Sequence, residues 1–364
     1  MNAEFNLDQY LSDGVEAIVS DALKAAFKNP KETAFLLQYT LHAKRAAAKR
    51  ETHAKAGRHV PSFLIASITS RCNLHCAGCY ARANNICHDG TDEGLLTDAE
   101  WENIFVQAAE IGVSFVLLAG GEPMLRRGVI ECASDHPDLL FPIFTNGTLL
   151  GEQTLELLDR RRNLVPIISV EGDEAQTDAR RGAGTYQKLL ETMTALQSRG
   201  VFFGASVTVT SENLPFVTSD AFLSDLRERG CKIAFYVEYV PADPGTESLA
   251  PGDAERVYLT SRLDELRARS DAMVYVAFPG DEQYAGGCMA AGRGFFHINP
   301  HGGAEPCPFS PVSDTSLKDV SLLEALDSPL FVRLRSSELL AEHHDGACAL
   351  FGREDEVRSL CERS

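Results

Sequence analysis

The sequence of 364 residues lacks the features that mark membrane, secreted and nucleic-acid-binding proteins. No run approaches the roughly 18 apolar residues that a membrane span needs. The opening residues MNAEFNLDQY are acidic and have neither the basic start nor the apolar stretch of a secretory signal. Basic residues are scarce, with 34 Lys and Arg against 52 Asp and Glu, and the formal charge of −18 repels phosphate backbones. We therefore expect a cytoplasmic protein that binds no nucleic acid.

The composition is otherwise that of a globular protein. Hydrophobic residues make up 44% and charged residues 24%, which argues against wholesale disorder. The ten cysteines are the unusual feature. In a reducing compartment, cysteines bind metals or take part in chemistry more often than they form disulfides.

Hydrophobic patterning divides the chain into three parts. Residues 1–60 have helical periodicity, and the basic later half of this segment is either a solvated face or a docking surface for an acidic partner. Residues 61–270 alternate strand-like and helix-like patterns. Residues 271–364 are looser, with Gly, Pro and Cys clustered after Gly280, and we expect a small metal-binding module closed by helices.

The central part predicts an α/β fold, a partial (βα)6 TIM-like barrel. Six short apolar, β-branched runs are separated by helical stretches, which indicates parallel βα units. In such a barrel, ligands bind at the carboxyl ends of the strands. The six runs are SFLIASIT, VSFVLLAG, LLFPIFTN, LVPIISVEG, VFFGASVTVT and KIAFYVEYV, and VYVAF is a candidate seventh.

Three cysteines follow the first predicted strand at a spacing that suits an iron–sulfur cluster. Cys72, Cys76 and Cys79 form C-x3-C-x2-C in ITSRCNLHCAGCYARA. Three thiolates on one loop bind three irons of a cubane cluster and leave the fourth iron open, which allows catalysis as well as electron transfer. The alternative is a zinc site, for which His75 or His88 would supply the fourth ligand.

This motif, followed by the aromatic Tyr80 after strand one of a six-unit barrel, resembles the radical S-adenosylmethionine (radical SAM) superfamily. The resemblance covers roughly residues 62–240. It implies a [4Fe–4S] cluster whose open iron chelates the amino and carboxylate groups of S-adenosylmethionine. An electron, from a donor such as flavodoxin or ferredoxin, then cleaves the cofactor to a 5′-deoxyadenosyl radical.

Further motifs at the ends of the next strands match the cofactor-binding segments of that superfamily. GGEP follows strand two and corresponds to the segment that holds the cofactor's ammonium group, although alone it would be only a glycine turn. ISVEG at strand four offers a hydroxyl and a carboxylate, or else a helix cap. In DARRGAGTY, Arg181 would face the cofactor carboxylate, with Arg180 as the competing assignment. The cofactor-binding residues that the resemblance implies are Tyr80, Gly120, Gly121, Glu122, Pro123, Asn146, Ser169, Glu171 and Arg181.

A second cysteine group lies near the C-terminus. Cys288, Gly302 and Cys307 form C-x13-G-x4-C, which resembles the auxiliary-cluster modules called SPASM or, in shortened form, twitch. Only Cys348 and Cys361 follow, so the ligands suffice for one auxiliary [4Fe–4S] cluster and not for two. If Cys361 is not a ligand, the auxiliary cluster has an open iron that could bind substrate. A zinc site is the alternative for these four cysteines.

The reacting groups are less clearly marked. Glu238 in FYVEYVP is a candidate substrate contact, and an ordinary salt bridge is equally consistent with its position. Cys87 is a candidate hydrogen-atom donor or acid–base group, whereas we expect Cys132 and Cys231 to be small buried apolar residues.

The resemblance implies an oxygen-sensitive oxidoreductase that abstracts hydrogen from an unactivated carbon. An auxiliary cluster favours oxidative modification or cross-linking of a peptide, although residues 1–60 do not have the mixed strand–helix pattern that often holds leader peptides. A dehydrogenase or epimerase acting on a small biosynthetic intermediate is the alternative within the superfamily. A non-catalytic iron–sulfur or zinc-binding protein is the alternative outside it.

Overall fold

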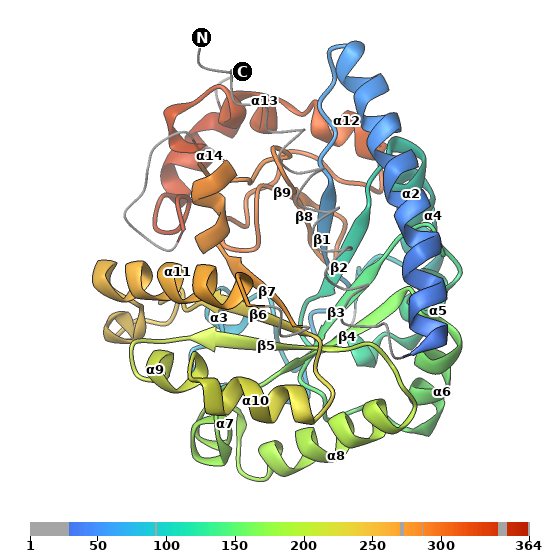
Figure 1. The fold of residues 1–364 in the computed structure, drawn as a ribbon. Helices are drawn as coiled ribbons and strands as arrows, with labels where there is room; N and C mark the ends of the chain where they lie inside the picture. Colours follow the sequence, from blue (N-terminus) through green and yellow to red (C-terminus); the bar gives the residue numbers. More distant parts are fainter. Residues whose placement is uncertain (1–28, 92, 270–272, 286, 341–347, 363–364) are drawn as a thin grey trace.

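The fold is a parallel sheet that curls into a partial barrel, as the alternating pattern predicts (Figure 1). Seven strands lie side by side in chain order, and each neighbouring pair is parallel. They are β1 (Phe63–Ser67), β2 (Phe115–Ala119), β3 (Phe141–Thr145), β4 (Leu164–Ser169), β5 (Gly204–Val209), β6 (Ile233–Glu238) and β7 (Val274–Phe278). The computed structural model describes residues 29–91, 93–269, 273–285, 287–340 and 348–362; the first half of the helical segment expected over residues 1–60 lies outside them.

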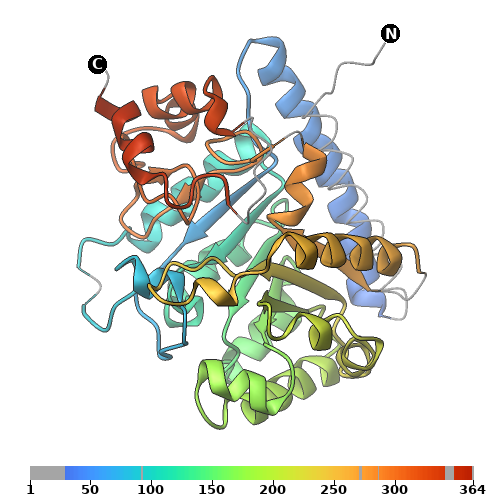
Figure 2. The ribbon, with the colours of Figure 1, turned by 90° about the vertical axis from the view of Figure 1, so that its left-hand side faces the viewer.

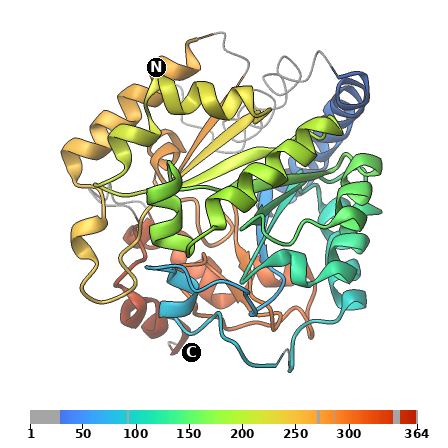
Figure 3. The same cartoon turned by 90° about the horizontal axis from the view of Figure 1, so that it is seen from below.

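Amphipathic helices cover the outer face of the sheet (Figures 1 and 3). The strand residues that point outward, such as Leu64 and Val116, share one apolar core with Trp101 and Phe105 of the first of these helices. The helices are α4 (Asp98–Ile111), α5 (Arg127–Ser134), α6 (Glu152–Arg160), α8 (Thr185–Ser198), α10 (Asp220–Glu228) and α11 (Asp253–Arg267). Three further helices, α3 (Tyr80–Ala83), α7 (Glu174–Arg181) and α9 (Leu214–Val217), follow β1, β4 and β5. No described helix is long and apolar enough to span a bilayer.

Helix α2 (Pro30–Lys55) packs against the amino ends of the strands, away from the cysteine loop (Figure 2). Its start is encoded locally, because the Asn29 side chain accepts from the backbone of Lys31 and Pro30 needs no donor in the first turn. Leu36 packs in a cluster with Val165 and Phe202. The helix therefore covers the amino end of the barrel with apolar side chains.

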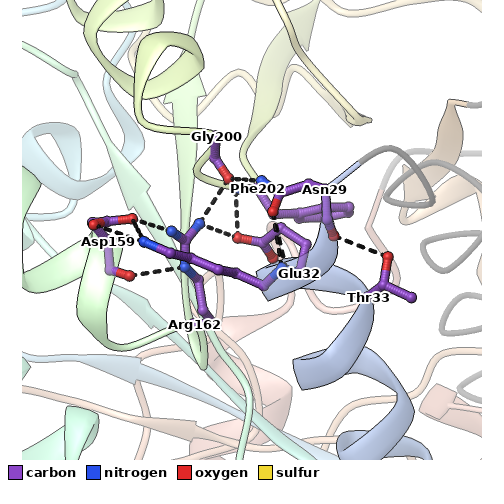
Figure 4. Close-up of polar contacts among 8 residues, drawn as sticks. Asn29, Glu32, Thr33, Asp159, Arg162, Gly200 and Phe202 are labelled. Atoms are coloured by element: carbon purple, nitrogen blue, oxygen red, sulfur yellow. Dashed lines mark hydrogen bonds and ion pairs between the residues drawn. The ribbon is translucent and has the colours of Figure 1, made fainter.

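A buried ion pair fixes α2 to the barrel (Figure 4). Arg162, just before β4, donates to the carboxylates of Glu32 and Asp159 and to the carbonyl of Gly200. Glu32 also accepts from the backbone N–H of Phe202 at 3.2 Å. Burial raises the pKa of Glu32, and the neighbouring guanidinium opposes this effect. Since the two partners are 3% and 8% exposed, each depends on the other for compensation of its charge.

The inside of the barrel is lined by alternate strand residues. Side chains of a strand alternate between its two faces, so every second residue reaches the interior. Phe63 and Ile65 of β1, and Val165, Ile167 and Ser169 of β4, follow this rule. The lining is apolar in the middle and becomes polar toward the carboxyl ends.

Two short strands attach the C-terminal part to the barrel, and neither was predicted. β8 (His297–Ile298) pairs in parallel with β1, and β9 (Ala304–Glu305) pairs antiparallel with β8. His297 Nε2 lies 2.7 Å from the Ser67 hydroxyl, and its Nδ1 lies 2.7 Å from the Glu305 carboxylate. The segment ends in α12 (Leu322–Leu326), α13 (Pro329–Arg335) and α14 (Glu354–Glu362), beside the β1 edge (Figure 2).

Candidate functional site

The three cysteines of the C-x3-C-x2-C motif lie in one loop at the carboxyl end of β1. Cys72, Cys76 and Cys79 are each half-buried, and all three line the cavity inside the barrel. Cys79 directly precedes α3. The loop therefore presents three thiols to one space, as the spacing predicts.

Close backbone packing holds this loop in place. The N–H of Ala77 donates to the carbonyl of Arg180 at 2.8 Å, which joins the loop to α7. Gly78 has φ +64°, and a Cβ at this position would lie 2.3 Å from the Tyr239 hydroxyl. Only glycine fits without displacement of that ring, so the motif's single glycine allows the loop to approach β6.

Each of two sulfurs has a distinct polar environment. The Cys72 sulfur interacts with the thiol of Cys87, which lowers the pKa of Cys72 to about 6, and lies 4.0 Å from the Asn146 amide. Arg181 Nη1 lies 3.9 Å from the sulfur of Cys76, although burial raises the pKa of that thiol. Cys87 is itself buried and does not line the cavity.

The GGEP turn packs directly on the cysteine loop. The N–H of Gly121 donates to the Thr69 carbonyl at 2.8 Å, and that of Glu122 donates to the Arg71 carbonyl at 2.7 Å. A Cβ on Gly121 would lie 2.0 Å from the Arg71 oxygen, so the second glycine is needed for contact between the loops. Gly120 and Gly121 both line the cavity.

Glu122 ties the ends of β2 and β3 together. Its carboxylate accepts from the Thr145 hydroxyl and the Asn146 N–H, both at 2.7 Å, and from the Met124 N–H at 3.0 Å. Burial raises the pKa of Glu122 to about 7, against the effect of these donors. Pro123 is buried and opens the short helix that follows. The acidic residue of the turn therefore positions Asn146 at the cavity wall.

Both candidate arginines pair with Glu171. Arg181 Nε donates to the Glu171 carboxylate at 2.8 Å, and Arg180 Nη1 lies 2.9 Å from it. Thr208 donates its N–H to the same carboxylate at 3.2 Å. The two arginines lower the pKa of Glu171 although it is buried. Both arginines and Ser169 line the cavity, whereas the contacts of Glu171 hold the arginines in place.

The cavity has a volume of about 1170 Å³ and runs from the cysteine loop to α2. Its wall includes Tyr80, and Glu238 at the end of β6. Glu238 is 4% exposed and accepts from Arg256 Nε at 3.0 Å, as a salt-bridged residue would. The residue also borders the cavity, so both interpretations of its role stay open. The phenylalanines of the wall are Phe35, Phe63, Phe115, Phe144, Phe202, Phe235, Phe278 and Phe309.

Two of the four cysteines of the second group are buried, and the other two are half-buried. Cys288 and Cys307 are 4% and 3% exposed, and the thiols of Cys307 and Cys348 are hydrogen-bonded. Glu282, a residue that the sequence did not single out, adjoins Cys288, and burial raises the pKa of Glu282 to about 8. Cys361 is half-buried on α14 and packs against the apolar core.

The remaining cysteines agree with their expected structural role only in part. Cys231 is fully buried, and Cys132 is half-buried against the core.

Sequence patterns could not have found Glu282, because one carboxylate in the GDEQYAGG segment has no distinctive spacing.

The donors at the cysteine loop fit a cubane cluster with one open iron. Three thiols of one loop surround the end of a cavity, and a guanidinium and an amide lie near their sulfurs. Within the described ranges, no three Cys, His, Asp or Glu side chains are close enough to hold a single ion. Each thiolate of a cubane binds a different iron, so cluster ligands need more separation than the ligands of one ion.

Fold and site together define a barrel enzyme of the iron–sulfur class, with its cluster at the carboxyl ends of the strands. The family model of the radical SAM superfamily matches residues 66–222. This match identifies residues 66–222 as a radical SAM domain, and enzymes of the superfamily use a [4Fe–4S] cluster and S-adenosylmethionine. The expectations of family, fold class, enzyme and these two cofactors are therefore confirmed.

Similar proteins cover most of the chain. The AdoMet-dependent heme synthase of Methanosarcina barkeri is 27% identical over 311 residues, covering 78% of this chain and 87% of that protein. The PqqA peptide cyclase of Gluconobacter oxydans is 28% identical over 296 residues, covering 78% and 81%. Streptococcus suis SuiB bound to S-adenosylmethionine has the same fold, with a TM-score of 0.66, 18% identity and coverage of 92% and 83%.

Proposed function

We propose that this enzyme oxidatively modifies or cross-links a peptide. The observation that carries the proposal is the cavity of about 1170 Å³ inside the barrel. The three cysteines line this cavity, which is large enough to hold part of a peptide beside them. A relative similar over most of its length is a peptide cyclase, which supports a peptide as the substrate. We place the enzyme in the cytoplasm, with flavodoxin or ferredoxin as its electron donor.

Cys72, Cys76 and Cys79 would hold the radical cluster, with S-adenosylmethionine on its open iron. When bound, these groups supply a strong hydrogen-atom abstractor through reductive cleavage of the cofactor. The residues of this chain bind and orient the cofactor: Arg181, fixed by Glu171, offers a cation beside Cys76, and the GGEP backbone offers carbonyls at the cavity. The other proposed cofactor contacts are Tyr80, Asn146 and Ser169, with Glu122 and Pro123 shaping the turn.

The apolar phenylalanines serve to exclude water from the space where a radical would meet its substrate. Glu238 and Cys87 remain the candidates for direct participation. Of these, Glu238 has the stronger support because it borders the cavity. We retain the division into residues 1–60, 61–270 and 271–364, with the last part holding one auxiliary [4Fe–4S] cluster on Cys288, Cys307 and Cys348; its fourth ligand is considered below.

The proposal is tested with anaerobically reconstituted enzyme, dithionite and S-adenosylmethionine. We expect 5′-deoxyadenosine to form, and its yield to rise when the true peptide is added. Candidate peptides are short open reading frames encoded beside this gene, and mass spectrometry should show a loss of two hydrogens from the modified peptide. Formation of 5′-deoxyadenosine without modification of any such peptide would contradict the peptide assignment.

The apolar wall also favours a second candidate substrate, a large flat macrocycle. One relative is a heme synthase, and stacked or tilted aromatic side chains suit such a molecule. Such a macrocycle would be one specific case of the small biosynthetic intermediate that the sequence leaves open as an alternative substrate. Quenching of Trp or Tyr fluorescence by added porphyrin carboxylates, together with their oxidation under turnover, would favour it over a peptide.

A further inference from the structure

Glu282 lies in the segment that precedes the second cysteine group. It belongs to the short helical turn η3 (Gly280–Ala285), and Cys288 follows it by six residues. Glu282 is only 3% exposed. A carboxylate this deeply buried requires a compensating partner, because its charge is poorly solvated.

The partners within the protein satisfy one of its two oxygens. Oε1 accepts from the Met289 N–H at 3.2 Å, and the carboxylate also interacts with the Cys288 thiol. Oε2 is buried and has no hydrogen-bond partner among the residues that the structure describes. Unpartnered buried oxygens are rare in native proteins, and one on a carboxylate that also interacts with a cysteine thiol indicates a missing ligand.

The same carboxylate lies within reach of the second cysteine group. Glu282 is hydrogen-bonded to the Cys288 thiol and feels the charge of Cys348, and the thiols of Cys307 and Cys348 are hydrogen-bonded. Arg293 also acts on Glu282 and Cys288, and it donates to the Leu340 carbonyl at 3.2 Å. Three thiols and one carboxylate therefore gather with a cation beside them.

We propose that Glu282 is the fourth protein ligand of the auxiliary cluster, whose other ligands are Cys288, Cys307 and Cys348. This rests on the proposed function, since it takes the C-terminal cysteines to hold a cluster. It replaces Cys361, which lies half-buried on α14. Thiolates are the preferred ligands of iron–sulfur clusters, whereas carboxylates suit harder ions, so the oxygen bond is the most exchangeable of the four. Substrate can therefore displace Glu282 from its iron.

The experiment counts the auxiliary cluster alone. In the full chain, Cys72, Cys76 and Cys79 are changed together to Ala, and this parent should hold about four irons after anaerobic reconstitution. Glu282→Gln is added to the parent because glutamine keeps an acceptor for Met289 but is a poor iron ligand. We expect the fourth iron, which then has no protein ligand, to be lost on mild oxidation, with the electron paramagnetic resonance signal of a three-iron cluster that the parent does not give, in a protein whose circular dichroism is unchanged.

Two further variants separate the rival ligands. Glu282→Cys should restore about four irons with a shifted reduction potential, because a thiolate replaces a carboxylate. Cys361→Ser should keep about four irons and the parent spectrum. Full iron and an unchanged spectrum in Glu282→Gln, or an unchanged potential in Glu282→Cys, would overturn the assignment, as would iron loss in Cys361→Ser alone. A parent that holds no iron would instead overturn the proposed auxiliary cluster itself.

Discussion

The rings of Tyr80 and Phe309 pack against each other with their centroids 4.8 Å apart and their planes inclined by 55°. Tyr80 directly follows Cys79, and Phe309 lies two residues after Cys307. Burial raises the pKa of Tyr80, and both of these cysteines raise it further. This aromatic contact therefore joins the loop of the radical cluster to the segment that carries the second cysteine group.

Loss of this contact should weaken the attachment of the C-terminal segment. Phe309 is 8% exposed, so Phe309→Ala should lower the free energy of unfolding of the apo protein by about 3–5 kcal/mol. Tyr80→Phe, which keeps both rings, should cost less than about 1.5 kcal/mol. Urea denaturation of both variants makes the comparison, and equal costs would show that the ring contact is not the source of stability.

The cysteine loop should account for half of the bound iron. Reconstituted enzyme should hold about eight irons per chain, and the Cys72/Cys76/Cys79→Ala variant about four. The variant should also form no 5′-deoxyadenosine. Iron analysis and liquid chromatography measure the two quantities, and full iron content in the variant would refute the assignment of the radical cluster.

Arg181 and Arg180 should differ in their effect on cofactor binding. Both pair with Glu171, but Arg181 lies 3.9 Å from the Cys76 sulfur, whereas Arg180 Nε donates to the Ala77 carbonyl at 3.2 Å. Loss of a charge-assisted hydrogen bond costs about 1.5–3 kcal/mol, so Arg181→Ala should weaken S-adenosylmethionine binding about 10- to 150-fold. Arg180→Ala is the matched control with the smaller effect. Equal or reversed effects in calorimetric titration would contradict the chosen register.

The buried Glu122 should make stability depend on pH. Because its pKa is raised to about 7, the folded state binds more protons than the unfolded state between pH 4.5 and about 7. The contribution of Glu122 to the free energy of unfolding is therefore fully present below pH 4.5 and is lost as the pH rises through about 7. Relative to Glu122→Gln, the wild-type apo protein should lose about 3 kcal/mol over this range. Urea midpoints at several pH values test this, and parallel pH profiles would rule it out.

The buried ion pair between Glu32 and Arg162 should contribute far more to the free energy of unfolding than the exposed ion pair between Lys31 and Asp159. Glu32→Gln leaves the buried Arg162 without its charge partner, and we expect a loss of about 3–5 kcal/mol. Lys31→Ala removes an ion pair with Asp159 in which the lysine side chain is 64% exposed, and it should cost at most about 1 kcal/mol. Thermal unfolding in high salt distinguishes them further, since only the exposed pair is strongly screened.

The strands could be predicted because their information is local. Each of the seven apolar runs is long enough to define a strand, and the parallel order follows from the intervening helices. β8 and β9 could not be predicted, because two residues show no periodicity and His297 acquires its partners only when the chain folds back to Ser67.

The part of the site that is defined by residue spacing in the sequence was predictable. The part that depends on contacts between buried charged side chains was not. The cysteine loop could be predicted because its three cysteines lie within eight consecutive residues. The pairing of Glu171 with two arginines depends instead on α7 folding back over β4. Sequence reasoning assigned Glu171 to the cofactor, whereas its contacts here are with the arginines that face the cavity. Glu282 is significant only through its burial beside Cys288, which no pattern shows.

The pairing of β8 with β1 limits how this chain can be divided or recombined. Removal of the residues after β7 would leave the backbone donors and acceptors of β1 unpaired along one side, and such open edges promote aggregation. A C-terminal part taken from a related enzyme would fit only if it brought its own short strand in the same register, with a polar partner for Ser67. Replacement of the auxiliary part, in the laboratory or in evolution, thus has to occur at strand boundaries and not at the nearest loop.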